Sequence, residues 1–206
     1  MTDLNKIIFI DAEVAANGAA VTDVGALKGT GGEFHCASLA AFTDFLRGGE
    51  YICGHNILKH DFVYLKNEIS AGGAKFFIDT LYLSPLLFPK KPYHKLLKDD
   101  KLSAGELNNP LNDAKKARDL FYDEIDAFNG LDEKTQSVYF ELLGKTLEFR
   151  DFFKFIGRTG GACDAAALIR ETFAGKICAS SPIEKLIAKY PIELAYALAL
   201  IGVTRV

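Results

Sequence analysis

Hydrophobic positions alternate with polar ones over short stretches in the first half of the chain and recur at helical spacing in the second half. Short runs rich in β-branched and aromatic residues predict strands, at residues 6–14, 19–28, 32–39, 51–56 and 75–84, the last of which runs into a turn or helix. Apolar positions three and four apart predict helices, at residues 39–49, 60–69, 109–128, 132–156, 164–176, 182–190 and 191–202. Residues 84–107 carry prolines and lysines and are predicted to be irregular.

The order of these elements predicts the fold class. Three strands in succession are followed by helices that alternate with strands, which is typical of an α/β domain with a mixed sheet. Because the strand signal stops near residue 130, we expect a domain over residues 1–128 and an all-α extension over residues 129–206. The apolar helix at 191–202 is expected to be buried, since it contains Glu193 and is too short to span a bilayer.

Charge and cysteine usage restrict the function classes. The net charge is −3, so any contact with nucleic acid must be local rather than a basic coat. The four cysteines (Cys36, Cys53, Cys163 and Cys178) form no CxxC pair and predict reduced, buried thiols in a cytoplasmic protein. No signal peptide opens the chain, and its ending at VTRV is compatible with a natural end or with a fragment of a longer protein.

The strand FIDAEV ends with two carboxylates on one face. Side chains alternate along a strand, so Phe9, Asp11 and Glu13 point the same way. Two carboxylates this close to each other repel unless a cation lies between them. The alternative is a solvent-exposed strand end, where two acids cost little.

Two further acids stand where helices are predicted to begin. Asp61, in GHNILKHD, opens one helix, where an aspartate also serves as an N-cap. Asp113 precedes Ala117 and Phe121 at +4 and +8, so it faces the core with the apolar stripe, whereas Lys116 projects elsewhere. A first-turn acid is also favoured by the helix dipole, so both helix-end interpretations stay open.

In this order the segments resemble the DEDD family of 3′-5′ exonucleases, whose members include the proofreading subunit of bacterial replicative polymerase. FIDAEV corresponds to the first motif, with Asp11 and Glu13. GHNILKHD corresponds to the second, with Asp61 and with His60 in the place of an aromatic residue. NNPLNDAKKARDLF corresponds to the third, with Asp113. The resemblance covers roughly residues 5–128.

The resemblance implies a ribonuclease-H-like fold, with a mixed five-stranded sheet flanked by helices. It also implies that Asp11, Glu13, Asp61 and Asp113 hold two Mg²⁺ or Mn²⁺ ions for hydrolysis at nucleic-acid 3′ ends, with a single-stranded end as the expected substrate, in DNA repair or processing. Hard cations prefer carboxylate oxygens, and a metal pair can activate water and stabilise the leaving oxygen. The whole chain also resembles the N-terminal segment of certain large bacterial RecQ-like helicases, which implies a linked helicase module.

The family's general base is absent from the third motif. One branch has a histidine five residues before the last acid, where this chain has Asn108, and the other has a tyrosine four residues before it, where this chain has Asn109. A general base typically contributes about 10²–10⁴-fold, so its loss weakens a two-metal hydrolase without abolishing it. His94 and His60 are the candidate replacements for this base. Alternatively, His94 is a surface residue, and His60 packs in the position that an aromatic residue occupies in the family.

The remaining candidates are expected to bind substrate. They are Asn56, Asn108, Lys90, Lys91 and Lys95, and the lysines lie beside Tyr93 in the densest basic segment, which is otherwise a solvated loop. Two functions therefore stay open. One is a metal-dependent exonuclease with a non-standard base, and the other is a catalytically degenerate domain that binds nucleic acid or a partner.

Overall fold

The computed structural model describes residues 3–18, 20–96, 109–160 and 163–203, and the chain divides into two compact units. The first unit comprises Met1–Leu81 and Lys95–Tyr122, and the second comprises Tyr82–His94 and Asp123–Val206. Residues 82–94 therefore belong with the later helices rather than with the sheet. The predicted first domain, residues 1–128, included this segment.

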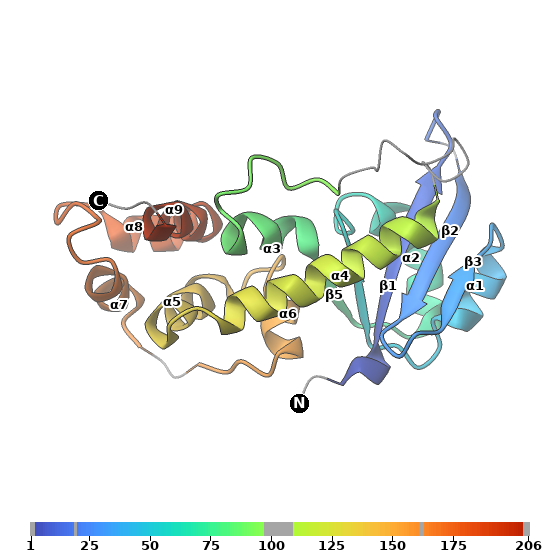
Figure 1. The fold of residues 1–206 in the computed structure, drawn as a ribbon, viewed down its shortest axis with the longest axis horizontal. Helices are drawn as coiled ribbons and strands as arrows, with labels where there is room; N and C mark the ends of the chain where they lie inside the picture. The colour runs from blue at the N-terminus through green and yellow to red at the C-terminus, as the bar shows by residue number, and fades with distance from the viewer. Residues whose placement is uncertain (1–2, 19, 97–108, 161–162, 204–206) are drawn as a thin grey trace. The chain divides into compact units, whose positions relative to one another are not determined.

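The first unit contains a mixed five-stranded sheet in the order β3-β2-β1-β4-β5 (Figure 1). Its strands are β1 (Ile7–Val14), β2 (Val21–Lys28), β3 (Glu33–His35), β4 (Tyr51–Gly54) and β5 (Phe76–Asp79), preceded by a short 3-10 helix at Leu4–Lys6. Strand β2 is antiparallel to both β1 and β3, whereas β4 runs parallel to β1 and β5 runs parallel to β4. The predicted fold class, an α/β ribonuclease-H-like sheet flanked by helices and followed by an all-α extension, is confirmed.

Most helices begin and end near their sequence signals, but α3 lies where the strand at 75–84 was predicted to run into a turn or helix, and it continues into the segment predicted to be irregular. They are α1 (Leu39–Phe45), α2 (Asp61–Gly72), α3 (Thr80–Leu87), α4 (Pro110–Asn129), α5 (Glu133–Leu143), α6 (Arg150–Phe155), α7 (Ala165–Thr172), α8 (Ile183–Lys189) and α9 (Pro191–Val203). The third strand is shorter than predicted because Ser38 already caps α1, its hydroxyl accepting from the Ala41 N–H. The helix predicted over 132–156 is two helices, because α5 ends at Gly144, whose N–H donates to Phe140.

The two faces of β1 pack against different helices. One face carries Ile8, Ile10 and Ala12, and it forms a core with buried residues of α1, α2 and their flanks, namely Phe42, Leu46, Leu65 and Ile69. The opposite face carries Phe9, whose ring lies 5.8 Å from that of Phe121 on α4. Burying each large apolar side chain contributes roughly 1.5–3 kcal/mol, so both helix layers are fixed to the central strand.

The second unit has its own aromatic core. Phe128 packs edge-on against both Phe152 and Phe153, at 5.7 Å between ring centroids in each case. Phe152, Phe153 and Phe155 are all buried in this core. Helix α9, which was predicted to be buried, is buried on one face only: Leu198 is covered, whereas Leu200 is 53% exposed. Among the described residues, no helix combines the length and apolar character needed to cross a membrane.

The cysteines are free, and most are not buried. Cys53 lies in the core of β4, but Cys36, Cys163 and Cys178 are exposed. The prediction of buried thiols was therefore wrong for three of the four, because these three lie in the segments that connect secondary-structure elements.

Candidate metal centre

Asp11 and Glu13 lie at the end of β1 on the face that α4 covers. Asp11 pairs across the sheet with Gly25, and Glu13 pairs with Asp23. Phe9, two residues earlier on the same face, is fully buried. On this face of β1 the buried Phe9 is therefore followed by two carboxylates, at Asp11 and Glu13, as the alternation of side chains along a strand predicts.

Gly25 explains how α4 reaches these acids. A Cβ atom at this position would stand 2.0 Å from the Leu111 backbone nitrogen and 2.2 Å from the Pro110 carbonyl carbon. Such distances are far inside van der Waals contact, so only glycine lets the first turn of α4 rest on β2. Since Gly25 is the cross-strand neighbour of Asp11, this close approach brings the start of α4 beside Asp11.

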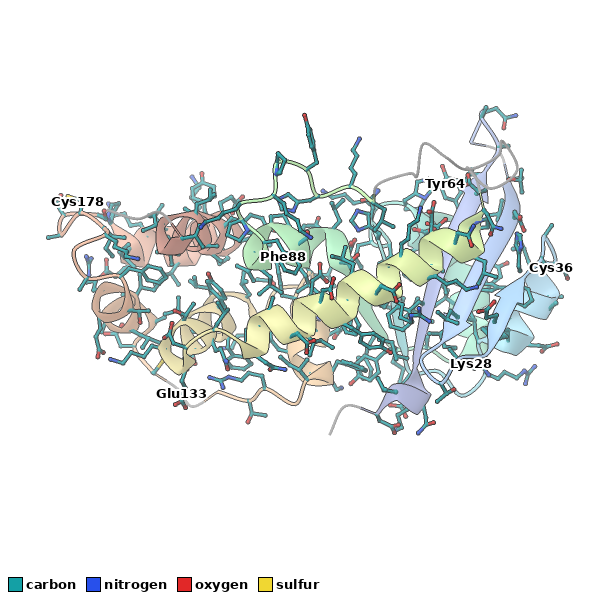
Figure 2. The ribbon with its side chains drawn as sticks, in the orientation of Figure 1. Lys28, Cys36, Tyr64, Phe88, Glu133 and Cys178 are labelled. Atoms are coloured by element: carbon teal, nitrogen blue, oxygen red, sulfur yellow. The ribbon has the colours of Figure 1, made fainter. Side chains whose placement is uncertain are left out.

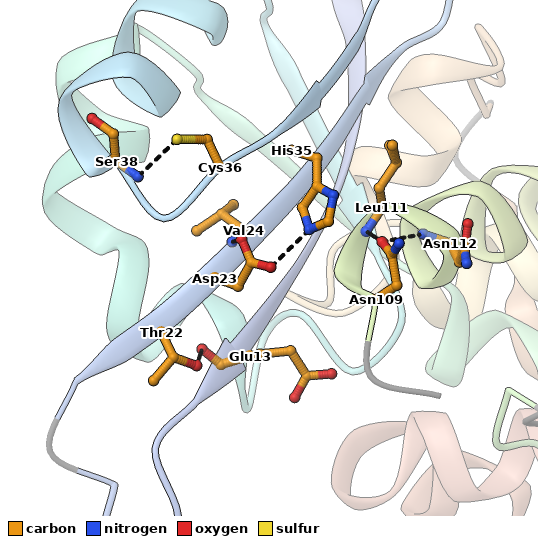
Figure 3. A network of polar contacts seen from close by, with 10 residues as sticks. All are labelled: Glu13, Thr22, Asp23, Val24, His35, Cys36, Ser38, Asn109, Leu111 and Asn112. Carbon is orange, nitrogen blue, oxygen red and sulfur yellow. Dashed lines mark hydrogen bonds and ion pairs between the residues drawn. The ribbon is translucent and has the colours of Figure 1, made fainter. Parts of the chain in front are cut away.

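Asn109 fixes the point at which α4 begins. Its side-chain oxygen accepts hydrogen bonds from the Leu111 N–H at 3.0 Å and the Asn112 N–H at 3.4 Å (Figure 3). Pro110 follows at the first helical position, where its missing N–H costs nothing. The residue at the family's tyrosine position is therefore a helix cap in this chain. Asn108, at the histidine position, lies outside the described residues.

The result is a cluster of three carboxylates from two distant parts of the chain. Asp11, Glu13 and Asp113 each offer an oxygen, and these atoms all lie within 4.8 Å of one another. Oxygens that bind one Mg²⁺, Mn²⁺ or Ca²⁺ at about 2.0–2.6 Å lie at most about 4–5 Å apart, so the spacing and the donor type both fit one hard divalent cation. We call these three residues the carboxylate cluster.

Asp61 is close to β1 but does not join the cluster at this spacing. It is 1% exposed, and its Oδ1 accepts a hydrogen bond of 2.8 Å from the Ala12 N–H. The N-cap of α2 is His60, which makes no side-chain capping bond, so the interpretation of Asp61 as an N-cap was wrong. Strand β4 pairs with β1 only from Ile7 to Phe9, so it offers no acceptor to the Ala12 N–H, and Asp61 accepts that hydrogen bond instead.

His60 lies beside this buried acid. Its Nδ1 is 3.8 Å from Asp61 Oδ1, and its ring meets the Tyr64 ring edge-on at 5.6 Å. The close contact with the Asp61 carboxylate raises the pKa of His60, an effect that burial opposes and that the negative charges of Asp61 and Glu13 reinforce. Tyr64 projects from the first half of α2 (Figure 2). His60 therefore packs on an aromatic neighbour, and its role as a proton acceptor stays a prediction.

Lys116 contacts the cluster, contrary to the prediction that it projects elsewhere. Its Nζ lies 3.4 Å from Asp113 Oδ1, one helical turn away. The two side chains are 29% and 18% exposed, so the pair is partly shielded from water. Sequence spacing alone misplaced Lys116 because a lysine stem is long enough to bend back over the preceding turn.

His94 and two of the candidate lysines belong to the second unit, and Lys95 belongs to the first. His94 Nδ1 lies 2.9 Å from Ser84 Oγ, and burial lowers the pKa of this histidine. Lys91 stands over the Phe88 ring at 4.1 Å. Lys90, Lys91 and Lys95 are exposed, as a solvated or a phosphate-binding segment requires, so their predicted roles stay predictions.

Asp79 is a buried acid that sequence reasoning did not single out. Its carboxylate accepts from the backbone N–H groups of Asn56, Leu58 and Leu81, at 2.8, 3.1 and 2.9 Å. These bonds hold the loop before α2, in which Asn56 takes a left-handed φ of 67°. The signal was present in IDT, an acid at the end of an apolar strand. The backbone of Asn56 thus has a structural task, while substrate binding by its side chain stays a prediction.

His35 was also missed. His35 on β3 is the cross-strand partner of Gly25 on β2, and its Nε2 lies 2.7 Å from Asp23 Oδ2 (Figure 3). Cross-strand register therefore places His35 and Asp23 on the same face of the sheet as Asp11 and Glu13. The sequence shows the alternation within each strand, but only the register between strands reveals this neighbourhood.

The chain matches no known protein family, no curated protein and no solved structure.

Proposed function

We propose that the first unit is a metal-dependent 3′-5′ exonuclease that hydrolyses phosphodiester bonds at nucleic-acid 3′ ends. The observation that carries this proposal is the carboxylate cluster, in which Asp11, Glu13 and Asp113 lie within 4.8 Å of one another. An acid cluster of this density is repulsive in the absence of a cation, and its oxygen ligands suit Mg²⁺ or Mn²⁺. The DEDD resemblance supplies the reaction class.

Each part of the chain has a task in this scheme. Strand β1 presents Asp11 and Glu13 on a rigid element, and the cap at Asn109 together with Gly25 holds Asp113 opposite them. Bound divalent cations supply the positive charge that activates water and stabilises the leaving 3′ oxygen. Asp61 keeps the end of β1 in place through Ala12. Lys95, which belongs to the first unit, is the proposed contact to the phosphates of an incoming single strand.

The proton acceptor is the least conventional part of the scheme. His60 is our first candidate, because it stands between Asp61 and Tyr64, and the negative charge of Glu13 contributes to its raised pKa. His94 is the second candidate. Without a well-placed base, the rate is expected to be lower by about 10²–10⁴-fold than that of an enzyme that has one.

A specific observation favours a second function, namely nucleic-acid or partner binding without hydrolysis. Asn109 uses its side chain to cap α4, so the residue at the tyrosine position is unavailable for proton transfer. In this alternative the cluster binds a cation that anchors a phosphate, and no bond is cleaved.

Degradation of a 5′-labelled single-stranded oligonucleotide distinguishes the two functions. We expect a ladder of shortened products with Mn²⁺ or Mg²⁺ and none with EDTA, and we expect Asp11→Ala and Asp113→Asn to abolish it. Asp119→Asn is the matched control, since Asp119 lies on the same helix, is exposed and pairs with Arg118.

The contrary outcome is equally informative. If wild-type protein at high concentration yields no products with either metal yet still retains the oligonucleotide in a metal-dependent way, the binding function replaces the exonuclease. A ladder that persists in Asp113→Asn would arise from a contaminating nuclease and would remove support for the proposal.

A further inference from the structure

Residues 88–94, which follow α3 in the second unit, combine basic and aromatic side chains. They read FPKKPYH, and the chain contains no aspartate or glutamate over residues 80–96. Lys90 and Lys91 are exposed, and Tyr93 is 76% exposed, more than any other large hydrophobic side chain among the described residues. We call residues 88–94 the basic-aromatic segment.

A turn and a ring contact hold the start of the basic-aromatic segment. The Phe88 N–H donates to the Ser84 carbonyl of α3 at 2.8 Å, and the Lys91 N–H donates to the Phe88 carbonyl at 2.9 Å. The second bond closes a four-residue turn with Pro89 at its second position, which suits the fixed proline φ of about −65°. Lys91 Nζ lies 4.1 Å from the centre of the Phe88 ring (Figure 2). The start of the segment is therefore fixed to the end of α3.

A side-chain hydrogen bond holds the other end of the segment. His94 is partly buried, and its Nδ1 lies 2.9 Å from the Oγ of Ser84, a buried residue of α3. Between the two anchors, Pro92 restricts both its own backbone and that of the preceding residue. Tyr93 is thus displayed to solvent on a segment that has already lost much of its conformational freedom. A ligand that stacks on this ring therefore meets a smaller entropic cost.

The chemistry of the segment favours single-stranded nucleic acid. Phosphates attract the ammonium groups of Lys90 and Lys91, and an unpaired base stacks on the face of an exposed ring such as that of Tyr93. A base in a duplex is already stacked on its neighbours and must leave the helix before it can lie on a protein ring. A purely anionic partner, such as an acidic peptide, would use the lysines and leave the ring without a role.

We propose that the basic-aromatic segment is a metal-independent binding site for single-stranded nucleic acid, in which Tyr93 stacks on a base and Lys90 and Lys91 contact the flanking phosphates. The segment belongs to the second unit and contains no member of the carboxylate cluster, so this binding does not depend on the proposed hydrolysis. It gives the second unit a function of its own.

The test is fluorescence anisotropy of a 5′-labelled oligothymidylate of about 20 nucleotides, long enough for one single-strand site. The 206-residue chain is titrated into it in EDTA, which prevents metal-dependent cleavage, and saturable binding is expected. Tyr93→Ala is expected to weaken binding at least about fivefold, the lower end of the range for one stacked base, whereas Tyr93→Phe keeps the ring and is expected to stay within about twofold of wild type. Lys90→Gln and Lys91→Gln are each expected to weaken binding and to reduce the slope of log affinity against log salt by about 0.7.

The second unit offers a matched control for both side-chain types. Tyr190 is 43% exposed, and Lys189 stands over its ring at 5.0 Å. Tyr190→Ala and Lys189→Gln are expected to keep the affinity within about twofold of wild type. Asp11→Ala is also expected to bind as wild type does in EDTA, and thermal unfolding establishes that every variant is folded.

Three outcomes with the labelled strand would overturn the inference: no saturable binding by wild-type protein, no weakening in Tyr93→Ala, or equal weakening in Tyr93→Ala and Tyr190→Ala. So would a duplex or polyglutamate that competes as well as unlabelled oligothymidylate at equal charge, because the segment would then bind anions in general. Since the assay contains no metal, the exonuclease proposal is decided separately by the cleavage ladder.

Discussion

Two helices of the first unit begin beside the end of β1, and each brings an aspartate in its first turn. At the start of α2, Asp61 is almost fully buried and holds the Ala12 N–H. At the start of α4, Asp113 is 18% exposed and lies with Asp11 and Glu13. The same residue type in the first turn of a helix thus serves the backbone in one case and a candidate ligand site in the other.

The difference lies in what faces each helix end. Beside α2, strand β4 does not pair with β1 as far as Ala12, so the Ala12 N–H needs another acceptor. Beside α4, the absence of a side chain at Gly25 lets the helix approach the sheet, and the carboxylates of Asp11 and Glu13 lie within 4.8 Å of that of Asp113. A first-turn aspartate therefore takes its role from the strand groups that the helix end meets.

The largest expected effect concerns cation binding. Asp113→Asn is expected to weaken Mn²⁺ binding at least about a hundredfold, since it removes one of three anionic oxygen ligands. Asp61→Asn, in which the amide oxygen still accepts from Ala12, is expected to keep the affinity within about threefold. Mn²⁺-dependent thermal stabilisation measures both. Equal losses in the two variants would show that Asp61 belongs to the ligand set after all.

The next prediction concerns Gly25. Gly25→Ala places a methyl group against the backbone of α4 and is expected to destabilise the fold by about 1–3 kcal/mol and weaken Mn²⁺ binding about tenfold, because the helix start must move. Urea unfolding and Mn²⁺ titration provide the two readouts. Gly31→Ala is the control for glycine removal at an open position, although its φ of 102° adds strain of its own. Unchanged Mn²⁺ affinity in Gly25→Ala would separate Gly25 from the site.

Asp61→Ala tests the structural half of the comparison. It leaves the Ala12 N–H without its acceptor and is expected to lower the free energy of unfolding by about 1–3 kcal/mol. Asp113→Ala removes a partly exposed acid from a repulsive group and is expected to change it by less than about 0.5 kcal/mol. Urea denaturation of the metal-free proteins compares them, and the reverse order would contradict the assignment of roles.

Asn109→Ala removes the side-chain cap of α4 and is expected to cost about 1 kcal/mol of stability. Asn109→Asp, which keeps the accepting oxygen, is expected to lie within a few tenths of a kcal/mol of wild type. Thermal unfolding checks both values. A stability loss in Asn109→Asp equal to that in Asn109→Ala would mean that the cap contributes nothing.

The last prediction concerns the pH dependence of stability that arises from Asp79, which binds the loop before α2. Burial raises the pKa of Asp79 above its ordinary value of 3.8, against three backbone N–H groups that act in the opposite direction. The native state then holds this proton more tightly than the unfolded state, so the contribution of Asp79 to stability falls as pH rises from about 4 through the raised pKa. Asp79→Asn is expected to lack this part of the slope in urea denaturation between pH 4 and pH 7. Identical slopes in both proteins would contradict the raised pKa.

The sequence predicted the sheet and most helices because apolar periodicity is a local property. Strand alternation placed Asp11 and Glu13 on one face and helix spacing turned Asp113 towards the core, but only the resemblance to the DEDD family implied that these acids would meet, and it included Asp61 with them. Asp61, Lys116 and His35 required more than periodicity. The partner of Asp61 depends on where β4 stops, the contact of Lys116 depends on a flexible stem, and the neighbours of His35 depend on a register across two strands.

Gly25 shows the same limit from another side. In AAVTDVGALK it looks like a weak point of a strand, because glycine lowers strand propensity. Its importance appears only when a segment more than 80 residues later settles against it. No local pattern contains that information.

The bond between Asp61 and Ala12 has a consequence for association between chains. The far end of β1 extends past β4 and would otherwise present an unpaired backbone donor to any extended peptide. A buried carboxylate on that donor, with the first turn of α2 behind it, denies another strand its first hydrogen bond. The acid that is least available for chemistry thus occupies a donor that β4 leaves open on the central strand, and the edges of the sheet are β3 and β5.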